Sequence, residues 1–342
     1  MNIENFKSGC IKQEIDPRDR KFKAKAIPWQ DIGDIDLRPK CSTPRAQGEI
    51  ASCTAFAATS MFDFVRRKHS MVSWKPSPLF TYYATRAGVS SVLEDSGATI
   101  RDAIKSTVRD GVSMERVWPY VIDRYNEKPP EEAWLIAEKH QTLEYLILND
   151  YDRNEWLNCL NDGYPFIFGA NLYTSFFDPI FTLLGGFMQD PDRFEEKIVG
   201  AHCMMAVGYI KDYNGKSYLI VQNSWGPEWG DKGYCYLPLS YVMSNDTFDF
   251  WTIRYTETTD EYPSDKIEEP VVIPPSTEPR NEPAIEPKTE PTVEPSNEII
   301  VEPPKTEVVV VPASVKEKQK TNLAFVLVVG FILGMLLLFL LF

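Results

Sequence analysis

The sequence predicts an α+β fold, and three stretches of residues, one helical and two extended, support that prediction. After Cys53, the apolar residues within 57–65 recur at the spacing of one helical face, which predicts an α-helix beginning near the cysteine. Residues 200–209 and 216–222 are rich in β-branched and aromatic side chains, which predicts two strands. The Asn-Gly pair at 214–215 is typical of a two-residue hairpin turn, so the strands are expected to pair antiparallel.

Composition divides the 342 residues into four segments. Residues 1–257 mix aromatic residues, glycines and short apolar runs, as a folded domain does. Residues 258–313 hold 13 acidic and 4 basic side chains, which accounts for most of the formal net charge of -13. A basic juxtamembrane segment at 314–322 and an apolar run at 323–342 complete the chain. No basic stripe stands out, so no nucleic-acid partner is expected.

The acidic segment carries a Glu-Pro pair every four residues from 278 to 295. Proline removes backbone donors and biases the preceding residue away from helix, while like charges repel along the chain. We therefore expect 258–313 to be a disordered, extended stalk, with a reach on the order of 100 Å. The alternative is a docking site for a proline-recognising domain.

The run 323–342 has no charged or polar side chain and predicts a single-pass transmembrane helix, because twenty helical residues span about 30 Å. A buried core helix is the alternative, but the stalk offers nothing to bury it. Three lysines within 314–322 favour a cytoplasmic domain 1–257, tail-anchored in a host or virion membrane. Gly330 and Gly334 form a G-x-x-x-G pattern and suggest a homodimer contact.

The cysteines and the first residues indicate a reducing compartment. The N-terminus begins MNIENFKSGC and has no apolar run, so no secretory signal is expected. The six cysteines lie far apart without a C-x-x-C pair, which favours free thiols. No metal site or cofactor is predicted.

Cys53 is a candidate nucleophile because it begins the predicted helix, with Ser52 as the N-cap. Unpaired amides and the helix dipole at such a position favour the thiolate over the thiol. A buried structural cysteine is the alternative, and Cys53 considered alone does not exclude it.

His202 and Asn223 are the second candidate pair. His202 begins the first predicted strand and Asn223 ends the second, so an antiparallel hairpin returns them to the same side. An asparagine oxygen beside the ring is expected to accept the Nδ1 proton and to leave Nε2 facing a nucleophile. An ordinary strand histidine is the alternative.

Three sequence blocks together are more specific than any single residue. They are Q-G-x-x-x-S-C-x-A-F at 47–56, G-x-H-x-x-x-A-V-G-Y at 200–209 and N-S-W-G-x-x-W-G-x-x-G-Y at 223–234. This pattern resembles the papain family of cysteine peptidases, over roughly residues 12–254. The S-C-T block and the stretch 95–103 are similar to a branch found in bacteria, archaea and large DNA viruses such as invertebrate iridescent viruses, so we expect a viral source.

The resemblance implies a two-lobed papain-like fold and a thiol endopeptidase acting on protein or peptide substrates. It implies Cys53 as nucleophile, His202 as base and later acid, and Asn223 as the residue that orients the histidine. It also implies an oxyanion hole containing the Gln47 amide, and a Trp225 ring that shields the histidine–asparagine bond.

Two further residues, Gly97 and Cys203, are implied to line the substrate site. Three departures from the family pattern matter. Ile50 replaces a structural cysteine, so the usual disulfide to the 95–98 region is not expected. Thr54 replaces an aromatic residue that follows the nucleophile in the family. The long inhibitory propeptide of the family is not expected in this chain. The rival functions are an inactive papain-like binding module and an acyltransferase that uses the same triad.

Overall fold

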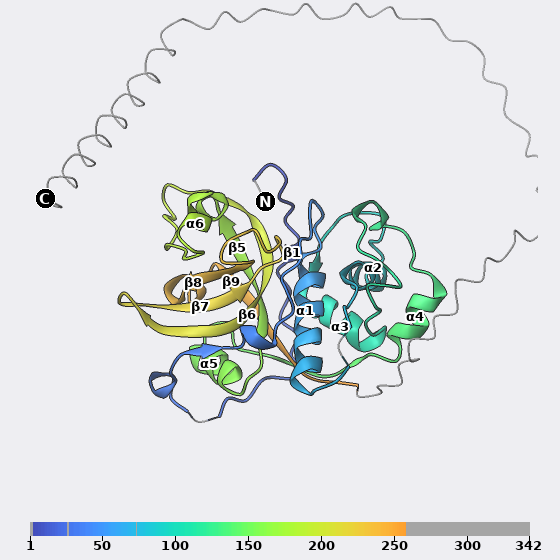
Figure 1. Cartoon of the computed structure of the whole chain (residues 1–342), viewed down its shortest axis with the longest axis horizontal. Helices are drawn as coiled ribbons and strands as arrows, with labels where there is room; N and C mark the ends of the chain where they lie inside the picture. The colour runs from blue at the N-terminus through green and yellow to red at the C-terminus, as the bar shows by residue number, and fades with distance from the viewer. Residues whose placement is uncertain (1–2, 26, 73, 258–342) are drawn as a thin grey trace, which may run out of the picture. The chain divides into compact units, whose positions relative to one another are not determined.

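A twisted antiparallel sheet and a group of helices pack on opposite sides of one long helix, α1 (Figure 1). The structure is a computed structural model that describes residues 3–25, 27–72 and 74–257, all within one compact unit. The predicted stalk, juxtamembrane segment and membrane helix lie outside the described residues. Within the described ranges, no helix is both long enough and apolar enough to cross a membrane.

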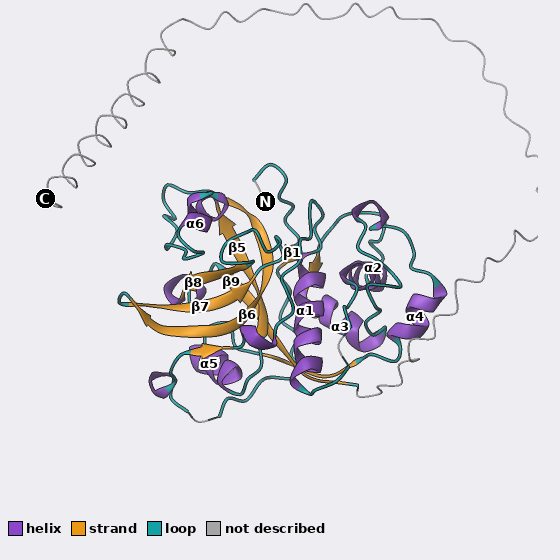
Figure 2. Cartoon of the chain, viewed as in Figure 1, coloured by secondary structure: helices purple, strands orange, loops and turns teal. Residues whose placement is uncertain are grey.

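Seven strands form the main sheet, in the order β4-β9-β5-β6-β7-β8, with β2 paired to β6 (Figure 2). A separate two-stranded parallel pair joins β1 to β3. The strands are β1 Cys10–Ile11, β2 Ile35–Asp36, β3 Ala98–Thr99, β4 Thr142–Ile147, β5 Phe166–Tyr173, β6 Ile198–Tyr213, β7 Lys216–Gln222, β8 Tyr234–Pro238 and β9 Thr247–Thr256.

Helices α2, α3 and α4 lie on the side of α1 that faces away from the sheet, whereas α5 and α6 lie by the sheet (Figure 1). They are α1 Cys53–Lys68, α2 Pro78–Gly88, α3 Ile100–Arg109, α4 Glu131–Ala137, α5 Arg153–Asn161, α6 Ile180–Leu183 and α7 Leu239–Val242. Short 3-10 turns occupy Trp29–Asp31, Arg38–Lys40, Ile122–Arg124 and Thr174–Phe177. The predicted α+β class and its division into a helical and a β-rich lobe are therefore confirmed.

Helix α1 begins at Cys53, as its apolar spacing predicted. Almost the whole helix is buried, because one face packs on β6 and β9 and the other on α2 and α3. Ser52 occupies the N-cap position, but its hydroxyl is 2.8 Å from the Tyr120 hydroxyl instead of capping the helix. The first amides of α1 are consequently left for other acceptors.

Strands β6 and β7 form the predicted hairpin, and Asn214 and Gly215 make its turn. Both have positive φ, 54° and 79°, which a two-residue turn of type I′ requires. The register pairs Met205 with Gln222. The open end of the hairpin therefore brings His202, just before Met205, close to Asn223, just after Gln222.

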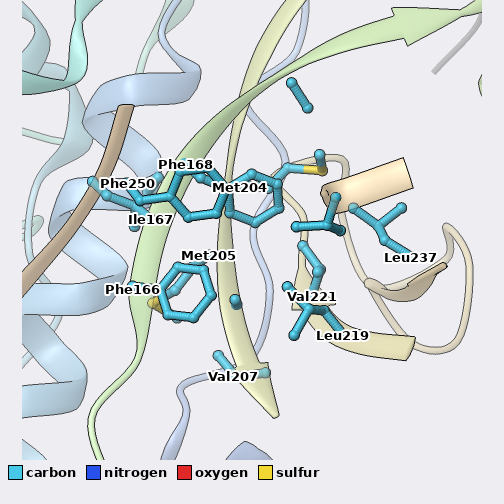
Figure 3. Packing of buried hydrophobic residues seen from close by; sticks show 14 of the residues in the cluster. Phe166, Ile167, Phe168, Met204, Met205, Val207, Leu219, Val221, Leu237 and Phe250 are labelled. Carbon is cyan, nitrogen blue, oxygen red and sulfur yellow. The ribbon is translucent and has the colours of Figure 1, made fainter. Parts of the chain in front are cut away.

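The main core lies between β5, β6 and β9 and the adjoining helices (Figure 3). Phe168 and Phe250 stack with their ring centroids 5.2 Å apart, and Trp156 of α5 stacks on Phe250 at 4.5 Å. Met204 and Met205 from β6 fill neighbouring positions. This packing makes β6 a rigid support for the residues at its start.

Candidate active site

Cys53 is the first residue of α1, and its side chain is fully buried. The backbone N–H groups of Cys203 and Thr54 lie close enough to its sulfur to lower the thiol pKa, against the larger opposing effect of burial. Because Cys203 directly follows His202, this contact sets the start of α1 against β6 next to the histidine. The start of α1, from the helical lobe, and the part of β6 next to His202 thus lie side by side.

His202 and Asn223 lie at the open end of the β6–β7 hairpin, both buried. The His202 Nε2 and the Asn223 Oδ1 are 2.7 Å apart. The expectation that Nδ1 would face the asparagine is therefore wrong. Nε2 is the ring nitrogen farther from Cβ, so it is the one that reaches a side chain on the neighbouring strand. Nδ1 is left without a hydrogen-bonding partner in the described part of the chain.

Trp225 and Gln47 lie beside this pair. The Trp225 ring centroid is 5.1 Å from that of His202. Gln47 is buried, its Oε1 accepts from the Ser224 hydroxyl at 2.6 Å, and its Nε2 donates to the Ile50 carbonyl at 2.8 Å. The amide orientation is thus fixed, with its nitrogen toward the loop that leads into α1, and one of its two N–H groups is already used.

A short N-terminal segment, residues 3–13, crosses the site. The Phe6 ring meets the His202 ring edge-to-face with centroids 5.8 Å apart. The Gly9 backbone lies against Cys53, so closely that a Cβ on Gly9 would be 2.9 Å from the sulfur. Both candidate catalytic side chains are therefore covered by the protein's own chain.

Contacts on both lobes hold this segment. The Ser8 Oγ accepts a hydrogen bond from the Ala201 N–H at 2.9 Å. Strand β1 pairs in parallel with β3, and the Gln13 N–H donates to the Asp249 carboxylate at 2.8 Å. Sequence reasoning missed this role, because the segment has no periodic pattern of apolar residues.

Gly97 and Cys203, the two residues implied to contact substrate, both meet the N-terminal segment. Gly97 has φ +70°, and a Cβ there would lie 2.5 Å from the Gly9 oxygen, so glycine permits the close backbone approach. Cys203 is buried in the same core cluster as Cys10, the first residue of β1. The cavity lined by Cys203 and Asn223 is only about 10 Å³, room for about one water.

Burial controls the charge of both candidate catalytic groups. It raises the pKa of the Cys53 thiol well above its usual value, an effect that the backbone N–H donors only partly offset. Burial also lowers the pKa of His202 to about 4, although the Asn223 oxygen works in the opposite direction. In this closed arrangement burial therefore favours the neutral form of both groups over the ion pair favoured by an open helix N-terminus.

A carboxylate occupies the region where the family disulfide is missing. Asp95 accepts hydrogen bonds from the Ala51 N–H at 2.9 Å and the Tyr82 hydroxyl at 2.6 Å, and pairs with Lys7 at 3.0 Å. All six cysteines are free. Among the described residues, no group of three or more His, Cys, Asp or Glu side chains could hold a metal ion.

Sequence comparisons agree with this site. Residues 33–244 match the papain family of cysteine proteases. A peptidase C1-like protein of Acanthamoeba polyphaga mimivirus, described as uncharacterized, is 36% identical over 278 residues, which are 74% of this chain and 87% of that protein. Chymopapain of Carica papaya is 56% identical over 54 residues, 16% of this chain and 15% of that protein. The expected kinship with proteins of large DNA viruses is confirmed by the mimivirus relative.

Solved structures give the same result. Xylellain, a cysteine protease from Xylella fastidiosa, is similar with a TM-score of 0.65 and 29% identity, covering 72% of this chain and 95% of that one. Procathepsin B of Trypanosoma congolense shares the fold, with a TM-score of 0.60 at 15% identity over 74% of this chain and 87% of that one. The chain therefore belongs to the papain family of cysteine proteases and is a cysteine-type peptidase.

Proposed function

We propose that the chain is a membrane-tethered thiol endopeptidase that hydrolyses peptide bonds with Cys53, His202 and Asn223. One observation carries this proposal: the 2.7 Å contact between His202 Nε2 and Asn223 Oδ1, which leaves Nδ1 as the ring nitrogen open to a second partner. The Cys53 sulfur, which lies near the backbone N–H of the residue after His202, is the candidate for that partner.

The chemistry follows from this tautomer. Asn223 keeps the proton on Nε2, so Nδ1 has the lone pair that takes the proton of the Cys53 thiol. The thiolate attacks the substrate carbonyl, and the Cys53 N–H and the free N–H of Gln47 stabilise the oxyanion. His202 then returns its proton from Nδ1 to the leaving amine, which leaves a thioester. Water, deprotonated by the same nitrogen, hydrolyses the thioester and restores the thiol.

The closed arrangement corresponds to a latent state in this proposal. Because His202 protonates the leaving amine, the carboxyl-terminal side of a substrate must lie on the His202 side of Cys53. The N-terminal segment places Phe6 there and carries the later strand β1 to the opposite side, against β3. Its direction is therefore the reverse of a substrate's, which explains how it can cover the nucleophile without presenting a bond for cleavage.

Membrane tethering is the second part of the proposal. The uncharged run 323–342 supports a single C-terminal anchor, and the lysines within 314–322 support a cytoplasmic catalytic domain. The Glu-Pro stalk would let that domain sweep the space near the membrane.

The test compares the full-length chain with Cys53→Ala and with Cys159→Ala, which removes a buried thiol elsewhere in the core. Cleavage of a peptide library, followed by mass spectrometry, should be lost in Cys53→Ala and kept in Cys159→Ala. Unchanged cleavage in Cys53→Ala would contradict the proposed nucleophile. Adding an amine separates the rivals: an acyltransferase gives amide products in place of acids, and an inactive binding module gives neither product nor labelling of Cys53 by a thiol-directed probe.

A further inference from the structure

The Phe6 side chain of the N-terminal segment is surrounded by rings next to the candidate base. Its ring centroid lies 5.1 Å from that of Phe177, 5.8 Å from that of His202 and 5.8 Å from that of Trp225. All three contacts are edge-to-face, with interplanar angles of 63°, 72° and 70°. Strand β6 also approaches the ring, because a Cβ on Gly200 would lie 3.2 Å from a Phe6 ring carbon. We call the space bounded by Phe177, His202, Trp225 and Gly200 the aromatic box.

The walls of the aromatic box are held by further packing. Phe177 is the last residue of the 3-10 turn that follows β5, and it is half-buried. Its ring centroid is 5.3 Å from that of Trp225. The buried rings of Phe176 and Trp229 also contact Trp225, at 5.4 Å and 5.1 Å. Walls that are packed against other side chains keep their shape when the occupant leaves.

The position of the box relates it to one residue of a substrate. In the proposed mechanism, His202 protonates the nitrogen of the residue that follows the cleaved bond, and His202 is itself one wall of the box. The side chain of that residue begins two bonds from this nitrogen, so it can reach the box. Opening of the N-terminal segment removes Phe6 and makes the same space accessible to substrate.

We propose that Phe177 is a specificity-determining residue, and that the aromatic box selects substrates with Phe, Tyr or Trp directly after the cleaved bond. The inference rests on the proposed function of the site and names its substrate class. Phe6 fills the box in the closed state, so the chain's own side chain shows which chemistry the walls accept.

The contact geometry favours an aromatic side chain over an aliphatic one. An edge-to-face contact places the positive edge of one ring against the negative face of another, which an aliphatic group cannot reproduce. A missing methylene in an apolar pocket already costs about 10-fold or more in kcat/KM. A substrate with phenylalanine after the cleaved bond should therefore exceed the same substrate with alanine by at least about 10-fold, and leucine should lie between them.

The first experiment measures kcat/KM of the full-length chain for peptides that differ only at the residue after the cleaved bond. In the wild type, the Phe-to-Ala ratio should be at least about 10. Phe177→Ala should bring this ratio close to 1, and Phe177→Tyr, which keeps the ring, should preserve it. Phe194→Ala is the matched control, because Phe194 is 99% exposed, and it should leave the ratio unchanged. A wild-type ratio near 1, or an equal ratio in Phe177→Ala, overturns the inference.

The second experiment needs no turnover. Phe6→Ala removes the occupant of the box, and iodoacetamide then alkylates Cys53 in the presence of phenylalaninamide or alaninamide. Phenylalaninamide should slow this alkylation at a concentration at least about 10-fold lower than alaninamide does. Adding Phe177→Ala to the same protein should remove the difference between the two amides.

Equal protection by the two amides in Phe6→Ala also overturns the inference. The two experiments separate the inference from the proposed function. A chain that cleaves no peptide, but in which phenylalaninamide protects Cys53 through Phe177, would contradict the peptidase function and support the aromatic box. Cleavage without any preference after the cleaved bond would support the peptidase and contradict the box.

Discussion

Replacing Gly9 by alanine is the sharpest perturbation of the closed site. A Cβ on Gly9 would lie 2.4 Å from the Ala51 carbonyl oxygen and 2.9 Å from the Cys53 sulfur. The first contact is with backbone, which cannot turn aside as a flexible side chain can. The N-terminal segment must therefore shift or leave, while the lobes beneath it keep their own packing.

The magnitude follows from the cost of overpacking, about 1–3 kcal/mol for one added methyl group in a tight contact. Since about 1.4 kcal/mol corresponds to a factor of ten, the ratio of open to closed molecules should rise roughly 5- to 150-fold. The labelling rate of Cys53 by iodoacetamide and the kcat/KM for a peptide substrate should rise by the same factor, up to the limit at which the site is fully open.

Gly33→Ala is the matched control, because a Cβ on Gly33 meets nothing within 4 Å. Intact-mass labelling kinetics on the wild type, Gly9→Ala and Gly33→Ala, under one set of conditions, measure the effect directly. A labelling rate in Gly9→Ala equal to that of the wild type would refute the reasoning that this segment covers the nucleophile.

Four further outcomes are expected. Asn223→Ala should lower kcat by about 10²-fold with little change in KM, because His202 loses the partner that fixes its tautomer. Steady-state kinetics measure this, and an unchanged kcat would contradict the orienting role of Asn223. In the closed wild type, burial raises the pKa of Cys53, so its thiolate fraction and its alkylation rate at pH 5–6 should be low. In Gly9→Ala, Cys53 should be alkylated quickly at the same pH. Equal pH profiles of the two proteins would contradict the idea that burial controls the thiol. Asp95→Ala should destabilise the fold by about 2 kcal/mol and lower the Tm by roughly 4–8 °C in calorimetry, since it leaves buried donors unpaired; an unchanged Tm counts against the bridging role. Removing residues 322–342 should give a soluble peptidase that is still active, and fractionation showing the full-length chain already soluble would rule out the anchor.

Several features followed from local sequence alone. The helix that starts at Cys53 was predictable because its apolar spacing matches one helical period, and the β6–β7 hairpin was predictable because Asn214 and Gly215 tolerate positive φ. The hairpin alone predicted that His202 and Asn223 come together, whatever the rest of the fold. These are short-range properties that neighbouring residues determine among themselves.

The tertiary structure decided which ring nitrogen faces the asparagine, because that choice depends on how far the neighbouring strand lies from the His202 Cβ. It also decided that residues 3–13 cover the site. Their contacts are made with residues far away in the sequence, such as Ala98, Ala201 and Asp249, so no local period marks them.

The protonation state of Cys53 and His202 also depends on the tertiary structure. A cysteine at a helix start favours the thiolate, and that much the sequence determined by itself. Burial beneath the N-terminal segment outweighs this local field, raises the pKa of Cys53 and lowers that of His202, because removing water penalises the charged form of both groups. Solvent access depends on the packing of the whole domain, which is why only the tertiary structure could decide it.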